Sequence, residues 1–321
     1  MSIRTPGPRP TVIGTCTLAP FQRPGGNAQR LAEGLALVDQ MAGEARAAGW
    51  ELDIVLLPEH FAQGDRLPHE KEAESLDGPL VAAMAAKARQ HHTHVALPIL
   101  LKDAGQFWNA LVMLGRDGQP VGAYRKIHPV LHLDGSLESG IIPGSAVPVF
   151  ELDVGRVGAQ ICFDVYFTDG WQALDDAGAE LVLFTSATSG VAAIKAHAWR
   201  HEYYVAASTF RAPSVVVDPL GREVARTTGD KEVRLTRVDL DYRVVPWNSL
   251  RDFGVALAEK YAGRIRQDWH REEDVCLVTS LDKSLPVGDL LKQEKLETHR
   301  EHLARNITCQ NTCRGGTFGR C

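Results

Sequence analysis

The chain has 321 residues, of which 44% are hydrophobic and 23% are charged, and its formal net charge is −5. This composition is typical of a globular protein with a large core. The small negative charge predicts no nucleic-acid surface, and no apolar run is long enough to cross a bilayer. Because the first ten residues contain no apolar signal core, we expect a cytoplasmic protein with no membrane partner.

In the first half of the chain, apolar runs alternate with helical patterns, which predicts an α/β fold with parallel strand pairing. Apolar residues recur at helical spacing after Gly25-Gly26, and Gly49 is expected to end that helix. An Asp117-Gly118 turn predicts a hairpin. The expected strands are 11–18, 54–57, 95–101, 110–114 and 121–125, and the expected helices are 28–48 and 79–90.

The second half continues as a mixed sheet with hairpins up to about residue 281. Beyond that point a charged helix is expected over 290–304, followed by an aperiodic tail over 308–321. We therefore predict one domain over 1–281 and a C-terminal helix and tail over 282–321. The expected strands are 147–154, 157–161, 181–184, 205–208, 214–217, 223–226 and 233–240, and the expected helices are 171–177 and 191–204.

Three of the predicted strands are followed by chemically reactive side chains. Glu59 follows the apolar run 54–57, Lys126 ends the second arm of the hairpin, and Cys162 follows the run 157–161. Strand ends are where α/β folds place their chemistry. A thiol becomes a nucleophile as a thiolate, which a nearby ammonium stabilises, and a carboxylate can take and return the proton. The alternative for Cys162 alone is a buried core cysteine.

The sequences around these residues resemble the nitrilase (carbon–nitrogen hydrolase) superfamily, on the side of its amidases and N-carbamoyl hydrolases. They read L-L-P-E-H-F around Glu59, Y-R-K-I-H around Lys126 and V-G-A-Q-I-C-F-D around Cys162. The likeness covers about residues 10–280. The resemblance implies a four-layer α-β-β-α sandwich, a homodimer or higher homo-oligomer, and no metal or organic cofactor.

The resemblance also implies the role of each site residue. Cys162 attacks the carbonyl carbon of an amide-like substrate, and Glu59 transfers protons. Lys126 and the backbone N–H of Phe163 hold the oxyanion. Glu138, in L-E-S-G-I-I-P-G, stands at the position of a second family glutamate and is expected to fix the Lys126 ammonium.

The residues beside the nucleophile indicate a branch of the superfamily. True nitrilases resemble Cys-Trp-Glu here, whereas this chain has Cys162-Phe163-Asp164. We therefore expect hydrolysis of a small linear amide or an N-carbamoyl compound, with a nitrilase, an acyltransferase or a non-catalytic member as alternatives. The following Phe167–Trp171 segment departs from the family's usual Phe-Pro-Glu and later Arg, so the resemblance implies no recognition of a substrate carboxylate there. Substrate specificity is expected in loops 61–76, 128–143 and 185–194.

Other groups of histidines and cysteines allow weaker hypotheses. A papain-like Cys–His dyad would use His128 or His132. Two histidine groups could suggest a metal site. We interpret His91, His92 and His94 as part of a solvated turn, and His197 and His201, whose i,i+4 spacing can bind metal, as structural histidines. In the tail, three thiols fall short of a zinc site unless a histidine contributes, so we expect free thiols at Cys309, Cys313 and Cys321.

Overall fold

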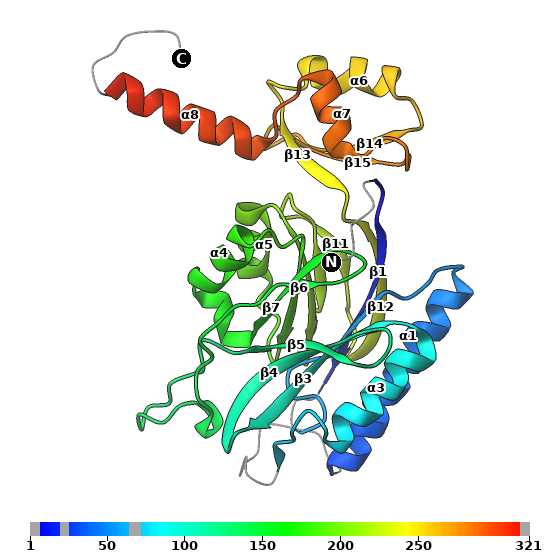
Figure 1. Ribbon diagram of the computed structural model, residues 1–321, viewed down its shortest axis with the longest axis vertical. Helices are drawn as coiled ribbons and strands as arrows, with labels where there is room; N and C mark the ends of the chain where they lie inside the picture. The colour runs from blue at the N-terminus through cyan, green and yellow to red at the C-terminus, as the bar shows by residue number, and fades with distance from the viewer. Residues whose placement is uncertain (1–6, 20–25, 64–71, 315–321) are drawn as a thin grey trace. The chain divides into compact units, whose positions relative to one another are not determined.

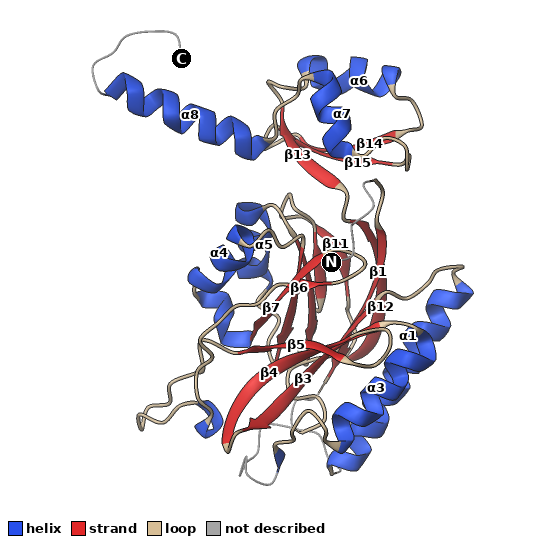
Figure 2. Cartoon of the chain, in the orientation of Figure 1, coloured by secondary structure: helices blue, strands red, loops and turns tan. Residues whose placement is uncertain are grey.

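The computed structural model describes residues 7–19, 26–63 and 72–314. The chain divides into two compact units, one spanning Pro10–Val238 and the other combining the segment up to Arg9 with the segment from Asp239 onwards. Figure 1 labels the elements and Figure 2 separates helices from strands. The predicted boundary at 281/282 between domain and tail is a different division, and it stays a prediction.

The larger unit contains one extensive mixed sheet, whose main path within the described residues runs β5-β4-β3-β2-β1-β9-β8-β7-β6. Strand β12 pairs with β1, and β10 joins β9 to β11. The strands are β1 Pro10–Leu18, β2 Ile54–Leu56, β3 His94–Asp103, β4 Gln106–Leu114, β5 Pro120–Arg125, β6 Phe150–Glu151, β7 Arg156–Ile161, β8 Leu181–Ser186, β9 Tyr204–Thr209, β10 Val215–Val217, β11 Glu223–Arg226 and β12 Lys231–Asp239.

The sheet consists of two halves that meet where β1 pairs with β9, at the single register pair Thr17 and Thr209. Helices α1 and α3 lie along the outer face of the β1–β5 half, and α4 and α5 lie along the outer face of the β7–β9 half (Figure 1). The inner faces contact each other through β4 and β7. The predicted four-layer α-β-β-α arrangement is therefore confirmed. The helices are α1 Asn27–Ala47, α3 Pro79–His91, α4 Asp169–Asp176 and α5 Val191–His201.

Sequence periodicity explains these layers. In α1 the buried residues Val38, Met41, Ala42 and Ala45 recur at helical spacing and pack against the sheet. Along the strands, successive side chains point alternately toward the two faces of the sheet. In β3, for example, Val95, Leu97, Ile99 and Leu101 face the helices, while the intervening side chains face the other half.

The smaller unit has its own antiparallel sheet in the order β13-β15-β14 and its own core. The strands of this sheet were not predicted from the sequence. One helix was predicted over 290–304, whereas the structure has two, because Lys295 adopts a left-handed conformation (φ 53°) that ends α7. The elements are β13 Tyr242–Pro246, α6 Val255–Lys260, β14 Ile265–His270, β15 Val275–Ser280, α7 Val287–Glu294 and α8 His299–Arg314.

The tail expectation is partly wrong. Helix α8 continues to Arg314, so residues 308–314 are helical. Cys309 is disulfide-bonded, whereas Cys313 carries a free, exposed thiol. Cys321 lies outside the described residues.

An ionic network ties together β3, the β4–β5 turn and the β6–β7 turn in the larger unit. Asp153 accepts hydrogen bonds from His94 Nε2 at 2.6 Å and Arg116 Nε at 2.8 Å, and Arg116 also contacts Asp53. The hydrogen bond from His94, followed by the charge of Arg116, holds the pKa of Asp153 below its ordinary value.

We expect Asp153→Asn to reduce the free energy of unfolding at pH 7 by about 1 kcal/mol, because solvent screens this half-exposed carboxylate. A carboxyl group with a lowered pKa stabilises the fold above its unfolded-state pKa of about 4, and the contribution disappears as the pH falls further. Urea unfolding at pH 7 and pH 3 measures this difference. Asp176→Asn, at an exposed carboxylate on α4 that contacts Gln172, is the control. If both variants lost the same free energy of unfolding at pH 7, the result would contradict the prediction.

Candidate active site

The predicted site residues lie at one edge of the sheet because the strands that carry them run in the same direction. Strand β1 is parallel to β2 and β9, β2 is parallel to β3, and β7, β8 and β9 are mutually parallel. Strand β4 is antiparallel to both β3 and β5, so β5 also runs in this direction. The carboxyl ends of β2, β5, β7 and β8 therefore share one edge, and Glu59, Lys126, Cys162 and Ala187 follow them.

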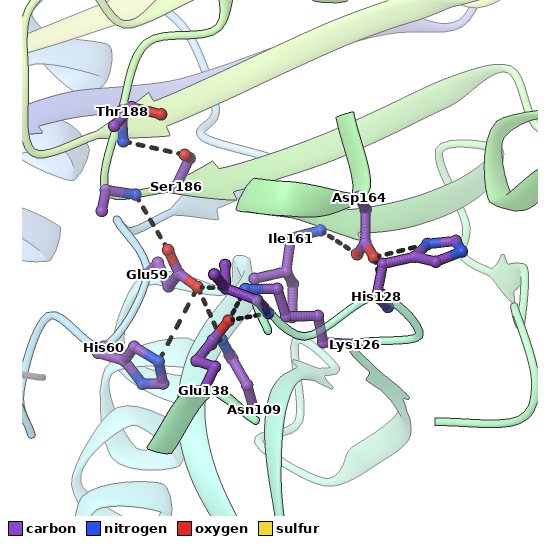
Figure 3. Close-up of polar contacts among 12 residues, drawn as sticks. Glu59, His60, Asn109, Lys126, His128, Glu138, Ile161, Asp164, Ser186 and Thr188 are labelled. Atoms are coloured by element: carbon purple, nitrogen blue, oxygen red, sulfur yellow. Dashed lines mark hydrogen bonds and ion pairs between the residues drawn. The ribbon is translucent and has the colours of Figure 1, made fainter. Parts of the chain in front are cut away.

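Glu59 is a buried carboxylate, and each of its two oxygens accepts at least one hydrogen bond. Only 3% of the residue is exposed. Its Oε1 accepts from Asn109 Nδ2 at 2.7 Å and contacts Lys126 Nζ at 3.3 Å, and its Oε2 accepts from the backbone N–H of Ala187 at 3.0 Å (Figure 3). These contacts fix both oxygens and offset the cost of burying a charge.

Lys126 lies between two carboxylates. Its ammonium donates to Glu138 Oε2 at 2.6 Å and to Glu59 Oε1, and the residue is 1% exposed (Figure 3). Burial alone would lower the pKa of Lys126, but the charges of Glu59 and Glu138 outweigh it and raise the pKa above its ordinary value. The pKa of Glu138 is lowered because the Lys126 charge outweighs the effect of burial. A permanent positive charge therefore faces the site.

Cys162 is the first residue of the 3-10 turn η2, Cys162–Tyr166, and has φ 47° in the left-handed region. Non-glycine residues in this region carry strain, which proteins retain chiefly at functional sites. The thiol interacts with Ser186 and the backbone of Ala187, and it is within electrostatic reach of both Glu59 and Lys126. The structure thus brings together the three reactive residues that the sequence indicates.

The surroundings of Cys162 determine whether its thiol is ionised. Burial, and after it the charge of Glu59, raises the pKa of the thiol to about 12, because the opposing charge of Lys126 is the smaller effect. In the free protein the thiol is therefore protonated at neutral pH, and a base must remove the proton when the sulfur attacks.

Asn109 is a site residue that was not predicted from the sequence. Its amide donates to Glu59 Oε1 and to Glu138 Oε1, at 2.7 and 2.9 Å, so it bridges the two carboxylates that hold Lys126. It is fully buried in β4, among Trp108, Ala110 and Leu111. A single amide in such an apolar strand is the signal that could have identified it.

The alternative histidine sites have other partners. His128 contacts Asp164 and Asp169 and stacks on Phe167, with ring centroids 3.9 Å apart. Within the described residues no hydrogen bond joins His128 or His132 to Cys162. His91 pairs with Asp39, His94 pairs with Asp153, and His197 bonds the carbonyl of Val165. These contacts favour structural roles for these histidines.

Three residues of the site are close enough together to be considered as ligands of a metal ion. Ligand atoms of Glu59, His60 and Glu138 lie within 4.8 Å of one another. The Lys126 ammonium already donates to both carboxylates, so a cation here would have to displace it. Catalysis without a metal stays a prediction.

Comparison with known proteins identifies the family of this chain. A family model for carbon–nitrogen hydrolases matches residues 13–246. The chain therefore belongs to the carbon–nitrogen hydrolase family. The predicted nitrilase-superfamily membership and the predicted enzyme class are confirmed.

The individual relatives share about a third of their residues or fewer with this chain over the matched regions. A protein of Pseudomonas protegens described as "Hydrolase in pqqF 5'region" is 32% identical over 58% of this chain and 64% of its own length, which is under two thirds. The 2-oxoglutaramate amidase of Bacillus subtilis is 28% identical over 59% of this chain and 78% of its own length. The crystal structure of Saccharomyces cerevisiae Nit3, a member of branch 10 of the nitrilase superfamily, matches with a TM-score of 0.61 at 18% identity. It covers 72% of this chain and 90% of that chain.

No helix in the described part of the chain is both long and apolar enough to span a membrane. Of the predicted specificity loops, 128–143 and 185–194 are described, whereas residues 64–71 of the loop 61–76 lie outside the described residues.

Proposed function

We propose that this protein hydrolyses the non-peptide C–N bond of a small linear amide or N-carbamoyl compound through a thioester on Cys162. The observation that carries the proposal is the placement of Lys126, which donates to Glu59 and Glu138 beside the thiol. The arrangement contains a protonated nucleophile, a fixed base and a permanent cation in a buried space, as acyl transfer requires.

In the first half-reaction, Glu59 takes the proton of Cys162 as the sulfur bonds to the substrate carbonyl carbon. The developing oxyanion is stabilised by the Lys126 ammonium and the backbone N–H of Phe163. Glu59 then gives its proton to the leaving nitrogen, the C–N bond breaks, and ammonia or an amine departs. The acyl group stays on Cys162 as a thioester.

In the second half-reaction, Glu59 removes a proton from water, and the resulting hydroxide adds to the thioester carbonyl. The C–S bond breaks, the acid leaves, and the sulfur regains the proton from Glu59. Glu138 and Asn109 support this cycle by holding Lys126 and Glu59 in place. The high pKa of Cys162 suits a thiol that ionises only as it attacks.

The substrate class rests on Cys162-Phe163-Asp164 and on the amidase-named relatives. A linear substrate with a terminal carboxamide is the first to test because one relative is a 2-oxoglutaramate amidase. A nitrilase is the second candidate, since a relative is named as a bifunctional nitrilase/nitrile hydratase. We further propose a cytoplasmic location and a homodimer or higher homo-oligomer.

A matched substrate panel tests the proposal. Amide, N-carbamoyl and nitrile compounds with the same carbon skeletons are incubated with the protein, and acid, amine and ammonia are measured. Intact mass spectrometry monitors an acyl adduct on Cys162. We expect turnover and an adduct with amides or carbamoyl compounds. Turnover of nitriles alone would favour the nitrilase, product formed only with an added amine would favour an acyltransferase, and no adduct with any compound would overturn the proposal.

A further inference from the structure

Asp164 is a fully buried carboxylate that the mechanism above does not use. It lies two residues after Cys162 and accepts four hydrogen bonds. Its Oδ2 accepts from the Tyr124 hydroxyl at 2.7 Å and from the backbone N–H of Ile161 at 2.9 Å. Its Oδ1 accepts from the backbone N–H of His128 at 3.0 Å and from His128 Nδ1 at 3.3 Å (Figure 3).

These donors come from two segments that carry reactive residues. Ile161 and Asp164 flank Cys162, whereas Tyr124 and His128 flank Lys126. Both segments therefore attach to the same pair of carboxylate oxygens, although Tyr124 and Asp164 are 40 residues apart in the chain.

The attachments are rigid. The hydroxyl of Tyr124, itself fully buried, also accepts from the backbone N–H of Ile127 at 3.3 Å. Burial and then the Asp164 charge raise the pKa of Tyr124 well above its ordinary value, so the phenol stays a donor. Trp171 Nε1 donates to the Asp164 carbonyl at 3.0 Å and holds η2 from its other side.

The left-handed backbone of Cys162 needs such support. A strained φ persists only where the surroundings over-determine it, and the bond from Ile161 N–H to Asp164 closes the turn around Cys162. We infer that Asp164 is a positioning residue, which holds the strained turn of Cys162 at a fixed place relative to the Lys126 segment. This inference rests on the proposed function of Cys162 and deepens it.

The inference is tested with Asp164→Asn, which keeps the shape but exchanges one acceptor oxygen for a donor. We expect kcat to fall about 100-fold, as for a misplacement of about 1 Å, with KM changed less than about threefold. A second readout needs no substrate, namely the pH dependence of iodoacetamide alkylation at Cys162, followed by peptide mapping. In the wild-type protein, alkylation of Cys162 should show no ionisation step up to about pH 10. In the Asp164→Asn variant, where the turn is released, the midpoint of the alkylation rate against pH should move toward the free-thiol pKa of about 8.5.

Tyr124→Phe provides a milder variant in case the first does not fold. Losing one hydrogen bond to a charged acceptor should reduce kcat about 10-fold. Two matched controls break similar contacts elsewhere and should leave kcat within twofold. Asp175→Asn alters the carboxylate beside His201, and Tyr261→Phe removes the hydroxyl that bonds Glu294.

Peptide mapping also separates local from global effects, because Cys16 and Cys276 are buried and should stay protected from alkylation. Folded variants with unchanged kcat and an unchanged alkylation midpoint would overturn the inference, as would exposure of all three thiols together. If the wild-type protein hydrolyses no compound in the panel, the proposed function fails, and the alkylation midpoint still decides the role of Asp164.

Discussion

Replacing Cys162 by alanine should reduce hydrolysis of the best amide or carbamoyl substrate by about 10⁴-fold or more, because no other side chain in the site can form the thioester. The fold should survive, since the change removes a single sulfur atom and adds no new group to the site. Steady-state ammonia release and thermal unfolding, measured on the same preparation, test both statements. The adduct seen by intact mass should disappear.

Cys276→Ala is the matched control. It removes a thiol that is not part of a disulfide and is fully buried in the smaller unit, and it should leave turnover within about twofold of wild type. Retention of turnover by the Cys162 variant would exclude the thioester mechanism. Loss of turnover in both variants would point to a general packing defect rather than to a nucleophile.

Replacing Lys126 by methionine should damage both catalysis and stability. Turnover should fall about 10³-fold, because a preorganised cation no longer faces the oxyanion. The free energy of unfolding at pH 7 should fall by about 3 kcal/mol, because the Glu59 and Glu138 carboxylates are left close together and buried without a cation. Urea denaturation of both proteins measures the second effect.

The pH dependence of this loss follows from the charges. With Lys126 present, the pKa of Glu138 is lowered, so its ionised form stabilises the fold above its unfolded-state pKa of about 4.3. Without Lys126, burial raises the pKa of that carboxyl group. The stability deficit of the variant should therefore be largest at neutral pH and shrink as the pH falls toward about 4.

Lys87→Met supplies the comparison for stability. Lys87 donates to both oxygens of Asp39, each at 2.7 Å, but this ion pair is solvent-accessible. Loss of this ion pair should reduce the free energy of unfolding by less than about 1 kcal/mol. Equal losses from the two lysine variants, or a deficit for Lys126→Met that does not change with pH, would contradict the buried-charge explanation.

Local patterns in the sequence predicted much of the larger unit. Apolar runs followed by Glu59, Lys126 and Cys162 located three strand ends, and the common direction of β2, β5 and β7 explains why their side chains meet. The helices α1 and α3 were predicted within about one residue of their observed ends, because their apolar spacing is regular.

Regions without a strong period were predicted less well. Strands β13 and β14 of the smaller unit were missed because they mix charged and apolar side chains, and in β14 only Ile265 is buried. Strand β15, Val275–Ser280, is an uncharged and buried run that was also not predicted as a strand. The break between α7 and α8 depends on the backbone of Lys295, which nothing in the local composition requires.

The reactive groups and the strand ends that carry them were predictable from the amino-acid sequence, because hydrophobic periodicity is a local property of the chain. Three features became evident only in the folded chain: Asn109 bridges two carboxylates, the surroundings of the Cys162 thiol favour its protonated form, and Asp164 joins the Cys162 and Lys126 segments. Each of these depends on distances between residues far apart in the chain and on the balance of burial against nearby charge. Those quantities exist only once the two halves of the sheet have packed together.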